Sequence, residues 1–266
     1  MIPFVTFTSD FGQSDTYVAS VKTAILSRIP EAIVIDVTHD IPPFQPILAL
    51  PALLEILEVA PPASIHLVVV DPGVGSRRMA LAGESDEFRF VFPDNGLPHA
   101  LTRWLKNMKF FHLSDPESFG GLASPTFQGR DLFAPAVAAL CRGRSASELG
   151  PEVRPCDLVS EAGLSGFAPE KLLVWNTDRF GNVLLGYRAF TPPDKVVVEG
   201  IGLPFPYVSR YQDVPRGRPG VLINSSGWLE IFCREGSAAQ LTGLRTGMFV
   251  KATIEGGQGR RLLGES

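Results

Sequence analysis

The spacing of apolar residues changes from segment to segment over residues 4–143. Short, nearly continuous apolar runs alternate with segments in which apolar residues recur every three or four positions. The short runs predict strands over 4–10, 32–39, 64–71 and 88–94, and the helical spacing predicts helices over 15–29, 46–60 and 129–143. Because strands and helices alternate, the pattern indicates a parallel sheet with helices packed against it.

The second part of the chain has a different pattern. Short strand-like runs are separated by Gly, Pro and Asn, over residues 171–178, 181–187, 195–200, 220–226, 228–235 and 248–256. This spacing is typical of a small antiparallel barrel or sandwich. Gly, Ser, Pro and Glu are frequent over residues 143–168. We therefore expect an α/β domain with a mainly parallel sheet over residues 1–166 and a smaller antiparallel β domain over residues 167–266, with the boundary near Phe167.

The composition narrows the classes of function. The 266 residues are 45% hydrophobic and carry a net charge of −4 without blocks of like charge, which does not fit a nucleic-acid-binding protein. The three cysteines are widely spaced, so we expect neither a zinc site nor a disulfide framework. The N-terminal residues lack the pattern of a signal peptide, and prolines and glutamates interrupt the most apolar tract, residues 46–71. We expect a cytoplasmic protein without a membrane partner.

Acidic and amide side chains follow three predicted strands at the point where each ends. Asp10 follows the first, Asp71 follows the third in "VVVDPGVGSRR", and Asp94 and Asn95 follow the fourth in "VFPDNG". Ligands of an open parallel sheet bind beyond the carboxyl ends of its strands, so these residues are candidates for ligand binding. A structural ion pair between Asp71 and a nearby arginine, and a tight turn at "PDNG", are the alternatives.

Three further motifs are candidates for ligand binding. "PTFQGRD", residues 125–131, opens a predicted helix, where backbone N–H groups favour a polar or anionic ligand. "NTDRFGN", residues 176–182, and "NSSGWLEI", residues 224–231, are either ligand-binding loops or plain hairpin turns. The four histidines show no spacing typical of a metal site, so no metal is expected.

Taken in order, these motifs resemble one known family. "TSDFGQSDTYV", "VIDVTHDI", "VVVDPGVGSRR", "PDNGL", "TFQGRDLFAPA", "DRFGNV" and "NSSGWLEI" resemble the S-adenosylmethionine hydroxide adenosyltransferases, which are related to the fluorinating and chlorinating enzymes. The resemblance runs from about Phe4 to Gly247. It implies an α/β domain followed by a β-barrel, and homotrimers that bind S-adenosylmethionine between the N-terminal domain of one subunit and the C-terminal domain of the next. The implied reaction is hydrolysis to adenosine and L-methionine, by in-line attack of water or hydroxide on ribose C5′, without a cofactor.

The resemblance also implies roles for residues of the first domain. Asp71 and Arg78 match an Asp–Arg pair that handles the attacking water together with a His, and this chain has Gln128 in place of that His. Asp10 matches the carboxylate that holds the ribose 2′- and 3′-hydroxyls. Phe44 matches an aromatic residue that packs on the ligand.

The remaining matches concern substrate binding. Asn95 matches the N-terminal side of the pocket. In the second domain, Asp178 matches the residue that binds the methionine ammonium, Asn182 matches one that contacts adenine, and Ser225 lies where the methionine carboxylate is held.

Gln128 is where the chain departs from the family pattern. Its carbonyl oxygen can orient a water molecule, but the amide cannot take up a proton. We therefore expect retained but altered hydrolysis, with a non-catalytic protein that binds S-adenosylmethionine or adenosine as the alternative. Halogenation is a more remote alternative, because the Asp71 carboxylate stands at the halide position and repels an anion.

Overall fold

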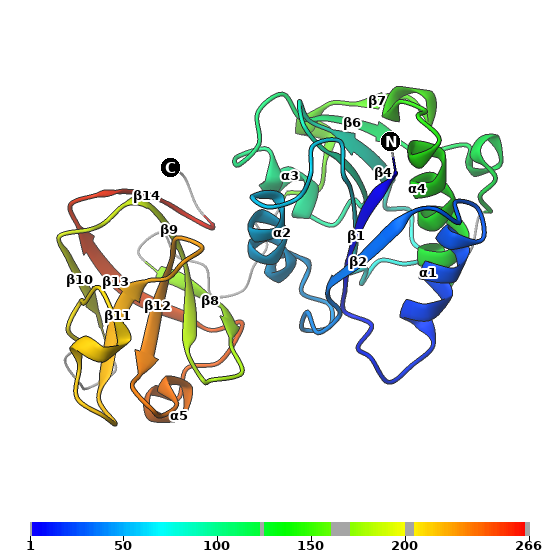
Figure 1. The fold of residues 1–266 in the computed structure, drawn as a ribbon. Helices are drawn as coiled ribbons and strands as arrows, with labels where there is room; N and C mark the ends of the chain where they lie inside the picture. The colour runs from blue at the N-terminus through cyan, green and yellow to red at the C-terminus, as the bar shows by residue number, and fades with distance from the viewer. Residues whose placement is uncertain (1, 123–124, 161–170, 200–204, 264–266) are drawn as a thin grey trace. The chain divides into compact units, whose positions relative to one another are not determined.

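The structure is a computed structural model that describes residues 2–122, 125–160, 171–199 and 205–263. The chain divides into two compact units, residues 1–163 and 164–266 (Figure 1). The predicted boundary near Phe167 lies outside the described residues.

The N-terminal unit is built on a seven-stranded sheet with the order β2-β1-β3-β5-β4-β6-β7. Its strands are β1 (Phe4–Ser9), β2 (Ile33–Thr38), β3 (Ile65–Val69), β4 (Ala80–Glu84), β5 (Arg89–Pro93), β6 (Lys109–His112) and β7 (Glu152–Val153). The four strands expected from the sequence, β1, β2, β3 and β5, pair in parallel and confirm the α/β prediction. Strands β4, β6 and β7 extend the sheet in antiparallel pairing, so the sheet is mixed. The sequence pattern did not reveal them, because β4 consists mostly of Ala and Gly and because β6 and β7 span only four and two residues.

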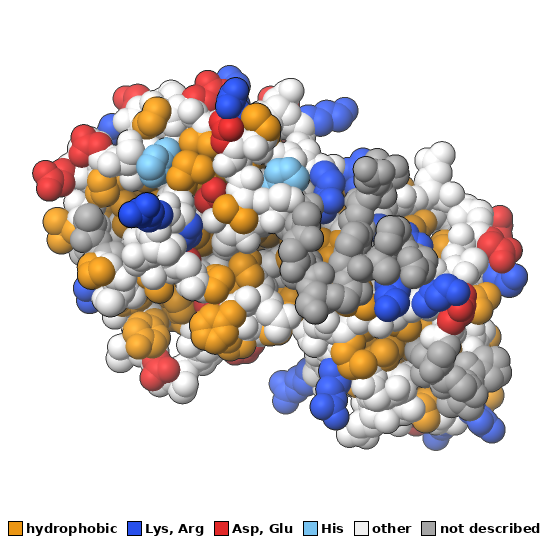
Figure 2. Space-filling view, turned by 180° about the vertical axis from the view of Figure 1, so that it is seen from behind, with side chains coloured by type: hydrophobic (Ala, Val, Ile, Leu, Met, Phe, Trp, Pro, Cys, Tyr) orange, Lys and Arg blue, Asp and Glu red, His pale blue; other side chains and the backbone are white. Residues whose placement is uncertain are grey.

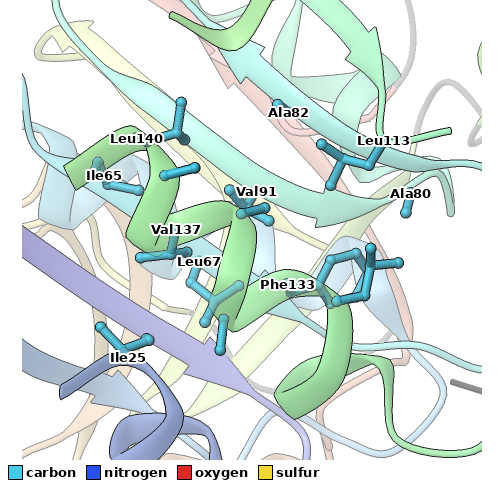
Figure 3. Close-up of a cluster of buried hydrophobic side chains, with 14 of the residues drawn as sticks. Ile25, Ile65, Leu67, Ala80, Ala82, Val91, Leu113, Phe133, Val137 and Leu140 are labelled. Carbon is cyan, nitrogen blue, oxygen red and sulfur yellow. The ribbon is translucent and has the colours of Figure 1, made fainter. Parts of the chain in front are cut away.

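The helices of this unit are α1 (Tyr17–Leu26), α2 (Ala49–Leu57), α3 (Leu97–Leu101) and α4 (Ala134–Cys141). The three predicted helices exist but are shorter than expected, and a π-helical turn, Gly129–Phe133, precedes α4. Side chains of α4 and this turn, such as Phe133, Val137 and Leu140, pack on the sheet residues Leu67 and Val91 (Figure 3). Each such side chain, once buried, contributes about 1.5–3 kcal/mol, so this packing fixes the π-helical turn at the end of the sheet.

The C-terminal unit is an antiparallel β structure. Its strands are β8 (Lys171–Thr177), β9 (Val183–Thr191), β10 (Lys195–Val198), β11 (Pro219–Ile223), β12 (Trp228–Cys233), β13 (Phe249–Glu255) and β14 (Gln258–Arg261), accompanied by helix α5 (Ala238–Thr242). The order is β10-β13-β8-β9-β12-β11, with β14 paired to β9, and the ladders are antiparallel. Alternate side chains of these strands, including Val174, Leu185 and Ile231, form one buried core. The predicted antiparallel domain is confirmed, and its sheet curls into a nearly closed barrel.

The surface matches the balanced composition. Acidic and basic side chains are interspersed on the face that Figure 2 displays. Within the described ranges, no helix is both long and apolar enough to cross a membrane.

Candidate active site

A pocket of about 420 Å³ lies in the N-terminal unit at the carboxyl ends of the parallel strands. Loops that follow β1, β2 and β3 line it together with the start of the π-helical turn. Four predicted site residues contribute to its wall: Asp10, Phe44, Asp71 and Gln128. The sheet therefore gathers residues that are up to 118 positions apart in sequence, between 10 and 128, at the edge where α/β sheets bind ligands.

Asp71, Arg78 and Gln128 form one connected polar cluster. The Arg78 Nε donates to Asp71 Oδ1 at 2.7 Å, and its Nη2 donates both to Asp71 Oδ2 and to Gln128 Oε1. The side chains of Asp71 and Arg78 are only 6% and 9% exposed. The ion pair anticipated as the structural alternative for Asp71 exists, and it lies at the pocket wall. The carbonyl oxygen of Gln128, expected to orient water, instead accepts from Arg78, and the amide nitrogen is its remaining polar group.

The glycine-rich turn of "VVVDPGVGSRR" brings Arg78 back beside Asp71. Gly75 has a φ of +77°, and a Cβ at this position would overlap the carbonyl oxygen of Pro125. Only glycine fits both the left-handed backbone and this close approach. The Asp71 Oδ1 also accepts the backbone N–H of Gly73 at 3.2 Å, which fixes the carboxylate on its own turn.

Asp10 and Phe44 face each other across two loops. The backbone N–H of Phe44 donates to Asp10 Oδ2 at 3.2 Å. Burial raises the pKa of the Asp10 carboxyl above its usual value, and the nearby charge of Asp71 adds to the rise, although the Phe44 N–H acts against it. Phe44 itself has a φ of +64° and is 74% exposed. An exposed aromatic residue in a strained backbone at a pocket rim suits contact with a flat ligand.

An aromatic wall of this pocket was not among the predicted features. Phe11, Tyr17 and Phe127 pack edge to face or tilted, with ring centroids 5.3–6.2 Å apart. The Arg130 guanidinium lies 5.0 Å from the centroid of the Phe127 ring. The signal was present in the sequence for two of them, since Phe11 and Phe127 stand inside "SDFG" and "TFQG", directly beside Asp10 and Gln128.

Asn95 is placed differently from the other predicted residues. Its Nδ2 donates to the Val70 carbonyl at 2.7 Å, and its Oδ1 accepts the backbone N–H of Leu97 at 3.1 Å. Asn95 is not among the residues that line the pocket. The "PDNG" motif leads from β5 into α3, its amide contacts the end of β3 next to Asp71, and the role of Asn95 toward a ligand stays a prediction.

The predicted residues of the C-terminal unit occupy two hairpin turns. Asp178 Oδ1 accepts the backbone N–H groups of Phe180 and Asn182, both at 2.9 Å, and Oδ2 accepts the Asn182 amide at 2.9 Å. Ser225 is exposed in the turn between β11 and β12, which Asn224 fixes by accepting the N–H of Trp228 at 3.0 Å. Asp178 and Asn182 therefore lie together, and their roles toward a ligand stay predictions.

The part of the chain that the structure describes contains no group of three or more His, Cys, Asp or Glu side chains arranged to hold a metal ion. The chemistry available at the pocket is that of a paired carboxylate, an arginine, an amide and an aromatic wall. These features define an α/β protein with a small-molecule-sized pocket beyond its parallel strands and a polar cluster at the pocket wall.

Comparison with known proteins identifies the family of this chain. Family models for the N-terminal and C-terminal domains of SAM hydroxide adenosyltransferase match residues 5–150 and 173–251. The chain belongs to the SAM hydroxide adenosyltransferase family. This confirms the resemblance seen in the sequence motifs.

Individual relatives agree with this placement. A Thermus thermophilus protein named (R)-S-adenosyl-L-methionine hydrolase is 37% identical over 93% of this chain and 98% of its own length. The crystal structure of an uncharacterized conserved protein from Thermotoga maritima superposes with a TM-score of 0.80 at 28% identity, covering 94% of this chain and all of that one. A fluorinase from Actinopolyspora mzabensis is a more distant relative, 22% identical over 94% of this chain and 97% of its own length.

Proposed function

We propose that the protein hydrolyses S-adenosyl-L-methionine to adenosine and L-methionine. The observation that carries the proposal is the Asp71–Arg78–Gln128 cluster at the wall of a pocket that also presents Asp10 and Phe44. Relatives at 30–37% identity are named (R)-S-adenosyl-L-methionine hydrolase, and we propose the same substrate, including its sulfonium configuration, for this chain.

The hydrolysis depends mainly on the positions of the reacting atoms. A water oxygen forms a bond to ribose C5′ while the C5′–S bond breaks, and the sulfur keeps the electron pair and leaves as the neutral thioether of methionine. The sulfonium is already an activated leaving group, so no acid has to protonate it. Alignment of the water, C5′ and sulfur supplies as much as about 7–11 kcal/mol. The water gives up one proton, and Asp71, the carboxylate of the cluster, accepts it and passes it to solvent.

Gln128 contributes orientation rather than proton transfer. Since its carbonyl oxygen accepts from Arg78, its amide nitrogen donates to a lone pair of the water. This donor holds the water while Asp71 accepts its proton. Because Gln128 cannot titrate, a binding protein without catalysis is the second candidate function.

The test follows adenosine and methionine by liquid chromatography after incubation with each sulfonium epimer of S-adenosylmethionine. Wild type, Asp71→Asn and Gln128→His are compared, with chloride or fluoride added in parallel. We expect adenosine from the wild type, a loss of at least about 100-fold in Asp71→Asn, and no halogenated nucleoside. Activity in Gln128→His alone would favour the binding protein. Halogenated nucleoside from the wild type would favour the halogenase.

We also propose that the protein is a cytoplasmic homotrimer that needs no cofactor. The predicted substrate residues are divided between the two units, which agrees with the family resemblance in which the C-terminal domain of one subunit completes the site of the next. Light scattering coupled to size-exclusion chromatography tests the trimer, and a mass of one chain would contradict it. Hydrolysis that persists after extensive dialysis against a chelator supports the absence of a cofactor.

A further inference from the structure

A buried Ser–His pair lies directly behind Asp10. Ser9, the last residue of β1, is fully buried, and its Oγ lies 2.7 Å from the Nδ1 of His39, which is 1% exposed. On the other side of the ring, His39 Nε2 lies 3.2 Å from Asp36 Oδ1, a close contact without the alignment of a hydrogen bond. Neither the ion pair of the pocket nor the proposed chemistry uses these groups.

These groups form a line of neighbouring polar side chains, Lys22, Asp36, His39 and Ser9, in which each donor and acceptor can be assigned. Lys22 on α1 donates to Asp36 Oδ2 at 2.9 Å. Burial acts to raise the pKa of the Asp36 carboxyl, but the hydrogen bond and charge of Lys22, together with the nearby His39 ring, outweigh it and hold this pKa below its usual value. An ionised Asp36 favours the His39 proton on Nε2, so Nδ1 accepts from the Ser9 hydroxyl. Ser9 Oγ in turn accepts the backbone N–H of Phe11 at 3.3 Å.

This line is not a hydrolytic triad. The Ser9 hydroxyl is closed to solvent and contacts Nδ1, whereas Asp36 is beside Nε2. A nucleophile has to reach its substrate, and Ser9 cannot. These side chains therefore act indirectly, by fixing the position of the neighbouring backbone.

That backbone carries Asp10. The Gly12 N–H donates to the His39 carbonyl at 2.8 Å, and the Ile41 N–H donates to the Ser9 carbonyl at 3.4 Å. The loop after β1 and the loop after β2 are thereby joined on both sides of the Ser9–His39 contact. The Phe44 N–H, from the second loop, reaches the Asp10 carboxylate of the first.

We propose that Ser9 and His39 are positioning residues that hold the Asp10 carboxylate where it can accept both hydroxyls of a ribose, with Asp36 fixing the orientation of the His39 ring. The proposal rests on the proposed function in that it takes the ligand to be a nucleoside. Ser9, His39 and Asp36 do not touch the ligand themselves.

The experiment measures the affinity of the full chain for adenosine and for 2′,3′-dideoxyadenosine by calorimetry. A hydrogen bond to a charged group corresponds to about tenfold in affinity or more, so two of them predict a preference for adenosine of about 100-fold in the wild type. In Ser9→Ala and His39→Gln we expect the preference to fall to about tenfold or less. Asp36→Ala, at a position 36% exposed and therefore tolerant, should lose part of it.

The matched control is a second hydroxyl–imidazole pair on the same strand. Thr6 Oγ1 lies 2.8 Å from His66 Nδ1, also buried, but points to β3 rather than to the Asp10 loop. Thr6→Val removes an equivalent hydrogen bond, and we expect it to keep the ribose preference within about threefold of the wild type.

The outcomes separate the two proposals. Retained preference in Ser9→Ala, His39→Gln and Asp36→Ala, or an equal loss in Thr6→Val, would overturn the positioning role. If Ser9→Ala and His39→Gln do not fold, Asp36→Ala decides by itself. A wild type that prefers adenosine but releases none from S-adenosylmethionine would refute the hydrolase while leaving the positioning role to the variants. A wild type without any preference would overturn the positioning role, whatever its hydrolytic activity.

Discussion

Removal of both partners of the Asp71–Arg78 pair should cost less stability than the losses of the two single removals added together. The two side chains are 6% and 9% exposed and share two hydrogen bonds, so either one alone leaves a largely buried charge without its partner. Breaking such a pair costs about 3–5 kcal/mol. We expect the lower end, about 3 kcal/mol, for Asp71→Ala, because Arg78 keeps its bonds to the Met79 carbonyl and to Gln128.

The assay is a double-mutant cycle of Asp71→Ala, Arg78→Met and the double variant, unfolded in urea without ligand. We expect the double variant to be less destabilised than the sum of the single ones by about 2 kcal/mol. The single Asp71→Ala variant should lower the midpoint of thermal unfolding by about 6–12 °C. Additive losses, or a loss below about 1 kcal/mol in Asp71→Ala, would refute the view of a buried and mutually dependent pair.

Three further predictions concern neighbouring positions. Gly75→Ala should lower the free energy of unfolding by about 2 kcal/mol, measured in urea, because a side chain at φ +77° is strained and meets Pro125; an unchanged midpoint would contradict this. Phe44→Asn should leave stability within about 0.5 kcal/mol, since Asn tolerates the left-handed backbone and Phe44 is exposed, yet weaken adenosine binding severalfold in calorimetry; equal affinity would contradict a ligand contact. Burial lowers the pKa of His66 to about 3, so between pH 6.5 and 3 the unfolded state binds one more proton than the folded state. The free energy of unfolding therefore falls by about 1.4 kcal/mol from this residue for each unit by which the pH is lowered. The free energy of unfolding should therefore change less steeply with pH in His66→Gln than in the wild type, and identical slopes would contradict the lowered pKa of His66.

The sequence predicted the parallel part of the fold well because its signal is local. A strand buried on both faces needs an apolar run such as residues 65–69, and a helix on the sheet needs an apolar stripe such as that of α1. The antiparallel extension was not predicted because β4 consists mostly of Ala and Gly, which are poor strand formers, and β6 spans only four residues. Their existence depends on pairing with β5 and with each other, which no local pattern encodes.

The candidate site also has features that the sequence predicts and features that depend on the tertiary structure. The sequence by itself determined which side chains stand at strand ends, and its motifs determined the family, since both are properties of short stretches. Only the tertiary structure decided that Gln128 turns its carbonyl oxygen to Arg78, that Asn95 serves the backbone beside Asp71, and that Ser9 meets His39 across 30 residues. Contacts of this kind depend on how strands pair and helices pack over the whole unit, so they exist only once the entire core has formed.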